Sequence, residues 1–173
     1  MIDAIPAAEC FLDHDQRQIL RPLDGNGDGT AACDIGAVEA VPAYVEFSVS
    51  TPHGTIVGRV YGALTVSGVG AHTIASLGGT APAGVAFPFA AIGFTAAIAV
   101  PGGSITVELE LPSPATSLWK NQNGVWFQVV DAEIDGTTIT YDLTDGEAGD
   151  ADGSANAVIV DPVGPGISAA FTG

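Results

Sequence analysis

Oxygen-bearing residues alternate with glycine in a short segment near the N-terminus. Asp24–Gly29 places Asp24, Asn26 and Asp28 at alternate positions and a glycine at the sixth, the spacing by which an EF-hand-like loop wraps a hard cation. Thr30 could add its carbonyl oxygen. Position twelve of such a loop is Ile35 rather than glutamate, so Asp34 or a more distant acid would have to close it. The pattern predicts a calcium loop; the alternative is a glycine-rich turn with solvated carboxylates.

A second, denser acidic cluster lies between residues 142 and 161. Crowded carboxylates repel one another by about 1 kcal/mol at 4 Å in water, and a bound cation would remove that repulsion. Calcium is therefore the expected cofactor, and magnesium is less suited because it keeps its waters. The alternative is a surface loop whose charges point into solvent. The candidate ligands here are Asp145, Asp150, Asp152, Asn156 and Asp161.

The chain contains two cysteines, Cys10 and Cys33, and both lie in the polar N-terminal block. A bond between them would close a short loop and stabilise the fold by about 3 kcal/mol. Zinc is the competing explanation, but two separated cysteines lack the paired spacing of a tetrahedral zinc site. The predicted disulfide implies an oxidising compartment, and therefore an extracellular or cell-surface location.

Aromatic residues gather on a predicted hairpin and the strand that follows it. Trp119 and Trp126 could stack on sugar rings if they were exposed, whereas packing into a core is the alternative. Catalytic patterns are weak, because the three histidines stand apart and no serine lies in a Gly-x-Ser-x-Gly elbow. We therefore predict no catalytic residue and do not expect an enzyme.

The charge balance excludes some partners. Aspartate and glutamate number 20 against 4 lysines and arginines, a formal net charge of −16, which repels nucleic acid and anionic lipid. Residues 41–107 form a middle block that is almost uncharged, with only Glu46 and Arg59. Its Ala81–Val100 portion is apolar enough to suggest a membrane span. Interrupting prolines and glycines and the lack of a basic flank argue instead for a strand buried on both faces. We expect no transmembrane segment.

Short segments of alternating or β-branched residues, separated by glycine, proline, asparagine or aspartate, predict strands throughout the chain. Asn123-Gly124 and Asp135-Gly136 are typical of hairpin turns. The expected fold is all-β, an antiparallel β-sandwich over residues 43–164, preceded by a disulfide-closed segment over 1–42 and followed by a tail over 165–173. The predicted strands are Tyr44–Ser50, Thr55–Tyr61, Ala63–Ser67, Ser104–Leu111, Val125–Val130, Thr137–Leu143 and Ala157–Val160.

Two resemblances to known families add to this interpretation. Asp15-Gln16-Arg17, Arg21-Pro22, and Cys33–Ala37 with Glu39 resemble the terminal signature of bacterial choice-of-anchor Q domains, over about residues 2–40. These domains follow or complete right-handed parallel β-helices, so the segment is expected to resemble a β-helix end. The sequence departs from that family at Gln18, where glycine is usual.

Residues of about 43–164 resemble a choice-of-anchor U domain, a module found near the C-termini of exported bacterial proteins. The resemblance rests on Phe87–Phe89, Leu109–Pro112, Trp119-Lys120, Trp126-Phe127, Leu143–Gly146, Gly149–Gly153 and Ala155-Asn156 through Val160–Pro162. Neither family implies a catalytic activity. The sorting helix that often follows such a domain is absent from this sequence.

These observations predict a non-catalytic, calcium-stabilised structural spacer near the anchor of an exported bacterial surface protein. Its partners would be the remainder of that protein or the cell envelope. The alternative is a calcium-dependent carbohydrate-binding or adhesin module. Apolar residues in the N-terminal segment could also drive formation of a homo-oligomer or filament; they are Ile2, Ile5, Phe11, Leu12, Ile19 and Leu20.

Overall fold

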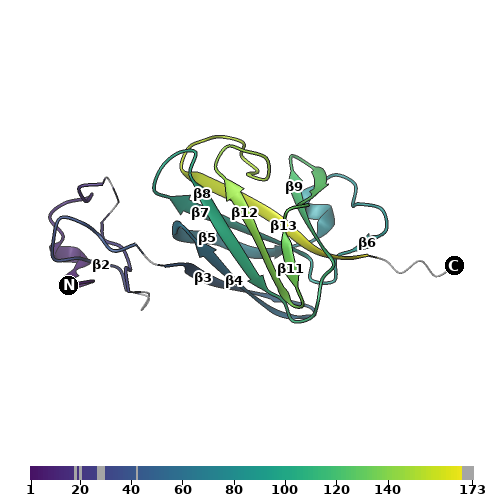
Figure 1. Ribbon diagram of the computed structural model, residues 1–173, viewed down its shortest axis with the longest axis horizontal. Helices are drawn as coiled ribbons and strands as arrows, with labels where there is room; N and C mark the ends of the chain where they lie inside the picture. Colours follow the sequence, from purple (N-terminus) through teal and green to yellow (C-terminus); the bar gives the residue numbers. More distant parts are fainter. Residues whose placement is uncertain (18, 20, 27–29, 42, 169–173) are drawn as a thin grey trace.

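The computed structural model describes residues 1–17, 19, 21–26, 30–41 and 43–168. Figure 1 shows a small N-terminal lobe at one end of the long axis and a larger β-sandwich beside it. The lobe contains the strands β1 (Ile5–Pro6) and β2 (Ala32–Cys33), which pair antiparallel, and the 3₁₀ turn η1 (Ala7–Glu9). The predicted all-β, antiparallel fold is confirmed.

One sheet of the sandwich has five strands in the order β11-β12-β8-β4-β3, each antiparallel to its neighbour. Its alternation of side chains follows the sequence pattern, because Ile105, Val107 and Leu109 are buried while Glu110 on the same strand is exposed. In chain order the members are β3 (Val45–Thr51), β4 (Gly54–Tyr61), β8 (Ser104–Glu110), β11 (Glu133–Asp135) and β12 (Thr138–Thr144).

The facing sheet has the strand order β10-β9-β13-β7-β5, and the short strand β6 (Val85–Ala86) pairs with the end of β13. Strand β7 comes from the apolar middle block and has six of its eight residues buried, as expected for a strand covered on both faces. The other members are β5 (Ala63–His72), β9 (Ser117–Gln122), β10 (Val125–Gln128) and β13 (Val158–Ser168); the 3₁₀ turn η2 (Ile74–Leu77) follows β5.

Apolar side chains from both sheets meet in one core. The rings of Phe47 on β3 and Phe94 on β7 lie 5.2 Å apart, centre to centre, and so join the two sheets. Gly58 makes room for Phe47, because a Cβ atom at that position would come within 2.2 Å of the ring. Burial of these side chains is the main stabilising term of the sandwich.

Both predicted hairpins are present. Asn123 and Gly124 have positive φ angles of 53° and 80° and connect β9 to β10, as a two-residue turn between twisted strands requires. Gly136, with a φ of 60°, lies in the turn from β11 to β12.

Strand β13 is longer than expected. The sequence predicted a strand over Ala157–Val160 only, and a proline such as Pro162 cannot donate to a ladder. In the structure β13 pairs with β7 as far as Val163 and with β9 over Val163–Gly166. Within this sheet, Pro162 is therefore paired with β7 only, and Pro165 is paired with β9 only. The strand continues to Ser168, four residues beyond the sandwich boundary expected at 164.

In the described residues, no helix has the length and apolar character needed to cross a membrane.

Candidate functional site

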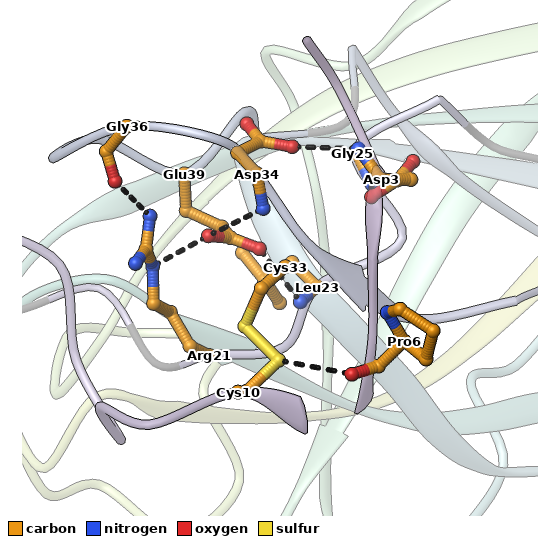
Figure 2. The surroundings of a disulfide bond; sticks show 10 residues. All are labelled: Asp3, Pro6, Cys10, Arg21, Leu23, Gly25, Cys33, Asp34, Gly36 and Glu39. Atoms are coloured by element: carbon orange, nitrogen blue, oxygen red, sulfur yellow. Dashed lines mark hydrogen bonds and ion pairs between the residues drawn. A yellow bond between two sulfur atoms is a disulfide. The ribbon is translucent and has the colours of Figure 1, made fainter. Parts of the chain in front are cut away.

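The predicted disulfide is confirmed. Cys10, which follows η1, is bonded to Cys33 in β2, with an S–S distance of 2.08 Å and Cα atoms 6.0 Å apart. Figure 2 shows the bond beside a group of acidic residues and Arg21. Cys33 is buried, and the bridge ties the start of the lobe to its second strand. A disulfide is compatible with an extracellular protein.

Three acidic side chains converge next to this bond. Asp3, Asp34 and Glu39 each place one carboxylate oxygen within 4.8 Å of the other two, an arrangement that could hold a metal ion. The sequence identified Asp34 as a candidate ligand. Asp3 and Glu39 were not assigned as ligands, because they lie outside the loop spacing that suggested a cation site.

The oxygens of this group already accept hydrogen bonds from the chain. Asp34 receives the Asp3 amide at Oδ1 (2.7 Å) and the Ala40 amide at Oδ2 (2.6 Å). Glu39 pairs through Oε2 with the Arg21 guanidinium at 2.6 Å and accepts the Leu23 amide at Oε1. A calcium ion here would have to compete with a buried cation and several N–H groups. The donor set fits calcium poorly.

Two described residues of the predicted loop, Gly25 and Asn26, contact this acidic group. The amides of Gly25 and Asn26 donate to the two carboxylate oxygens of Asp3 at 3.3 and 2.9 Å. These two residues therefore bind an acidic side chain that lies outside the predicted calcium motif. The side chains or backbones of Asp24, Asn26 and Thr30 all have interactions within the protein. The candidate ligand Asp28 lies outside the described residues.

The second acidic cluster is divided among separate environments. Asp145 is buried and accepts the amides of Gly102 and Ala157 at Oδ2, both at 2.8 Å, while its buried Oδ1 has no hydrogen-bond partner. Burial acts to raise the pKa of Asp145, but these backbone donors outweigh it and the pKa is lowered. This carboxylate therefore stays ionised and holds the two loops together.

Asp150 is completely buried and accepts the amides of Val160 at Oδ1 (3.0 Å) and Gly146 at Oδ2 (2.9 Å). Asp152 and Asn156 are more exposed and are linked to each other by a 3.2 Å hydrogen bond. Within the described part of the chain, these acids do not form a convergent group of three like that in the lobe. The loop is held by acid-to-backbone bonds.

Asp161, the last predicted ligand, lies inside the sandwich. Its Oδ1 contacts the ammonium of Lys120 on β9, and its Oδ2 accepts the Tyr141 hydroxyl of β12 at 2.7 Å. Lys120 and Asp161 are almost fully buried. Sequence reasoning placed Asp161 among the calcium ligands and missed its partner, although a lone lysine in an acidic, strand-rich region was a detectable signal.

Trp119 and Trp126 lie on the same face of β9 and β10, and both are half-buried. The indole N–H of Trp126 donates to the Gly78 carbonyl at 3.2 Å, and its ring lies 5.2 Å from that of Phe87. The Trp119 N–H donates to Ser117 at 3.0 Å. The chain itself thus covers part of the surface that a sugar would need.

Asp15 is a further buried carboxylate of the lobe and is held by several donors. Its carboxylate pairs with the Arg17 guanidinium at 2.8 Å and accepts the amides of Ile19 (3.0 Å) and Glu39 (2.9 Å). Burial acts to raise the pKa of Asp15, but the donors from Glu39, Arg17 and Ile19 lower it far below its ordinary value. The lobe therefore depends on an ionised carboxylate.

The apolar residues of the N-terminal segment do not share one environment. Phe11 is 97% exposed and Leu12 and Ile2 are also exposed, whereas Ile19 is buried. Ile5 is half-buried in β1. Leu20 lies outside the described residues.

No known protein family, no curated protein and no solved structure matches this chain.

Proposed function

We propose that the chain is a non-catalytic structural module of an exported bacterial surface protein, acting as a spacer close to its anchor. The observation that carries the proposal is how the acidic side chains are used. Asp15, Asp34, Glu39, Asp145 and Asp150 are all buried, and each accepts backbone N–H groups from other parts of the chain. Carboxylates used in this way hold loops in place and are not free to act on a substrate.

The arrangement of the chain supports a spacer. Figure 1 places the N-terminal lobe at one end of the long axis, while β13 runs towards the opposite end. A module that is entered and left at opposite ends separates its neighbours in a parent protein. Antiparallel strands joined by short turns and one continuous core suit that mechanical role.

Calcium stabilisation remains part of the proposal. The group of Asp3, Asp34 and Glu39 supplies three acidic ligands, and the unpartnered Oδ1 of Asp145 is one further free acceptor. Because N–H groups or Arg21 already occupy most of these oxygens, we expect any calcium effect to be small.

A glycan array, run with calcium and with chelator, tests the spacer proposal. The expected result is no specific binding in either condition, because the polar side chains are engaged within the fold. Binding to a defined sugar series would contradict the spacer proposal. Circular dichroism and the presence of the disulfide in the same sample would establish that the protein applied to the array is folded.

A carbohydrate-binding or adhesin role is the second candidate, favoured by one cavity. A hollow of about 700 Å³ between lobe and sandwich is lined by Asp24, Asn26, Tyr44 and Glu46, among others, a mixture of aromatic and polar groups that suits sugars. Tyr44 is exposed. If the array shows binding, Tyr44→Ala should abolish it, whereas the control Val125→Ala, on the exposed edge strand β10, should not.

A further inference from the structure

The only lysine of the chain is a core residue. Lys120 lies on β9 with 1% of its surface exposed, although lysine is among the residues that are rarely buried. Its ammonium contacts one carboxylate oxygen of Asp161, which is completely buried. A buried pair of this kind costs a large desolvation free energy, and well-packed apolar residues are often as stable or more so. The pair therefore requires an explanation beyond charge pairing.

Strand register brings the two groups together. Lys120 is opposite Val163 on the neighbouring strand β13, so Asp161, two residues away from Val163, points to the same face of the sheet. Tyr141 reaches them from the facing sheet: its hydroxyl donates to Asp161 Oδ2, and Lys120 Nζ lies 4.8 Å from the centre of its ring. Gly149 packs on the lysine stem, since a Cβ there would lie 3.0 Å from Lys120 Cδ.

The surroundings favour the uncharged forms of Lys120 and Tyr141. Burial lowers the pKa of Lys120 although the Asp161 charge opposes that shift, and burial raises the pKa of Tyr141 well above its ordinary value. Transfer of one proton from the ammonium to Asp161 converts the ion pair into an amine and a carboxylic acid. In a low-dielectric core this neutral pair is much closer in free energy to the ion pair than it is in water. Tyr141 remains a hydrogen-bond donor throughout.

We propose that Lys120 and Asp161 condense spontaneously into an intramolecular isopeptide bond that links β9 to β13. The lone pair of the neutral Lys120 Nζ attacks Asp161 Cγ, and the Nζ–Cγ bond forms. Oδ2 carries the developing negative charge and is held by the Tyr141 hydroxyl, while Oδ1, next to Nζ, takes up the protons that the nitrogen loses. The Cγ–Oδ1 bond then breaks and one water molecule leaves.

The reaction balances without any other reactant. One amine and one carboxylic acid yield one amide and one water, and no oxidant, reductant or activated group is consumed. A cavity of about 370 Å³, lined in part by Lys120 and Tyr141, lies next to the pair and offers the released water a way out. The product would covalently close the 41-residue separation between Lys120 and Asp161 and would remove both buried charges.

Intact-mass spectrometry of the purified, folded chain tests the proposal directly. After reduction and denaturation, the expected mass is that of the sequence minus one water molecule. Digestion should yield a branched peptide joining residues 120 and 161. An amine-reactive label applied in denaturant should modify the N-terminus only. A full-mass chain whose Lys120 is labelled in denaturant, after prolonged incubation of the folded protein, would overturn the proposal.

Variants locate the bond. Lys120→Arg keeps the charge but cannot form this amide, and Asp161→Ala removes the acid, so both should have their full calculated masses. Loss of water in either variant would place the bond elsewhere and overturn the proposal. Tyr141→Phe removes the donor to Oδ2 and should slow bond formation by about 10²-fold, measured as the time course of water loss after refolding.

Arg59→Lys provides the matched control. Arg59 pairs with Glu108 at 2.7 Å and Glu46 at 3.0 Å on a partly exposed sheet face, so the substitution places a lysine beside carboxylates in water. This variant should lose one water only, through Lys120. A second loss of water would show that proximity alone suffices, and would overturn the role assigned to the buried surroundings.

Discussion

The N-terminal lobe and the β-sandwich are ordered by different interactions within one acidic chain. The sandwich buries aliphatic and aromatic side chains from two facing sheets around Phe47 and Phe94. The buried part of the lobe is small and mixed: Asp15, Asp34 and Glu39 are enclosed together with Ile19, Leu23, Ala32 and the disulfide. A segment with little apolar surface can still be ordered if a covalent bond and ionised acceptors replace the missing core.

This comparison predicts the largest effect for a cavity in the sandwich. Phe94→Ala should lower the free energy of unfolding of the sandwich by about 4 kcal/mol, because it removes a buried ring that joins the sheets. Denaturant unfolding, monitored by the fluorescence of Trp119 and Trp126, measures this loss in the free energy of unfolding. The control Val125→Ala, at a side chain that is 65% exposed, should change it by less than about 0.5 kcal/mol. Equal losses in the two variants would contradict the assigned core.

Removal of the disulfide should affect the lobe alone. Replacing Cys10 and Cys33 together by serine should destabilise residues 1–40 by about 3 kcal/mol, because the unfolded lobe regains the entropy of an open loop. Hydrogen exchange in the lobe should accelerate while the melting midpoint of the sandwich stays the same. Reduced wild-type protein serves as the control. An equal fall in the sandwich midpoint would show that the two regions unfold as one unit.

Lowering the pH should loosen the lobe. The folded pKa of Asp15 is lower than the ordinary value of 3.8, so its contribution is complete above that value and is lost as the pH falls below it. Asp15→Asn should speed hydrogen exchange in the lobe at neutral pH and weaken its acid dependence. Asp131→Asn, at an exposed acid, is the control. The interpretation fails if the acid dependence of lobe exchange is the same in both variants.

Asp145 extends the acid prediction to the sandwich. Its pKa is also lowered, so protonation in acid should free the loops around Gly102 and Ala157 while the apolar core remains. Hydrogen exchange at those two amides, compared with exchange in β8, measures the difference. Simultaneous exchange of both sites would mean that the loop and the core are not separable.

Calcium should have the smallest effect. A weak site filled at a few times its Kd stabilises the folded state by about 1 kcal/mol, and the occupied oxygens of Asp34 and Glu39 argue against a stronger one. Thermal melting in millimolar calcium and in chelator measures it. Asp34→Asn and Asp150→Asn would assign any shift to the lobe or to the sandwich. A rise of many degrees in the melting midpoint would mean that the carboxylates leave their present hydrogen bonds to bind calcium.

The strands were largely predictable because their signals are local. Alternation in Ser104–Glu110 and the Asn123-Gly124 and Asp135-Gly136 turns depend on nearest neighbours along the chain, and the structure contains them as expected. The full length of β13 was not predictable in the same way. A strand can contain Pro162 only where one of its two edges is unpaired at that residue. The positions of β7 and β9 beside β13 decide this, and they are tertiary features.

The acidic residues show which features follow from the local sequence and which depend on the tertiary structure. By itself, the sequence determined an all-β chain, its acidic character, its turns and a cysteine pair suited to a bond, since residue type and short spacing control these features. Only the tertiary structure decided that Asp145 holds two loops, that Asp34 faces Asp3, and that Asp161 meets Lys120 inside the core. The role of a carboxylate depends on the donors around it, and here those donors come from distant parts of the chain.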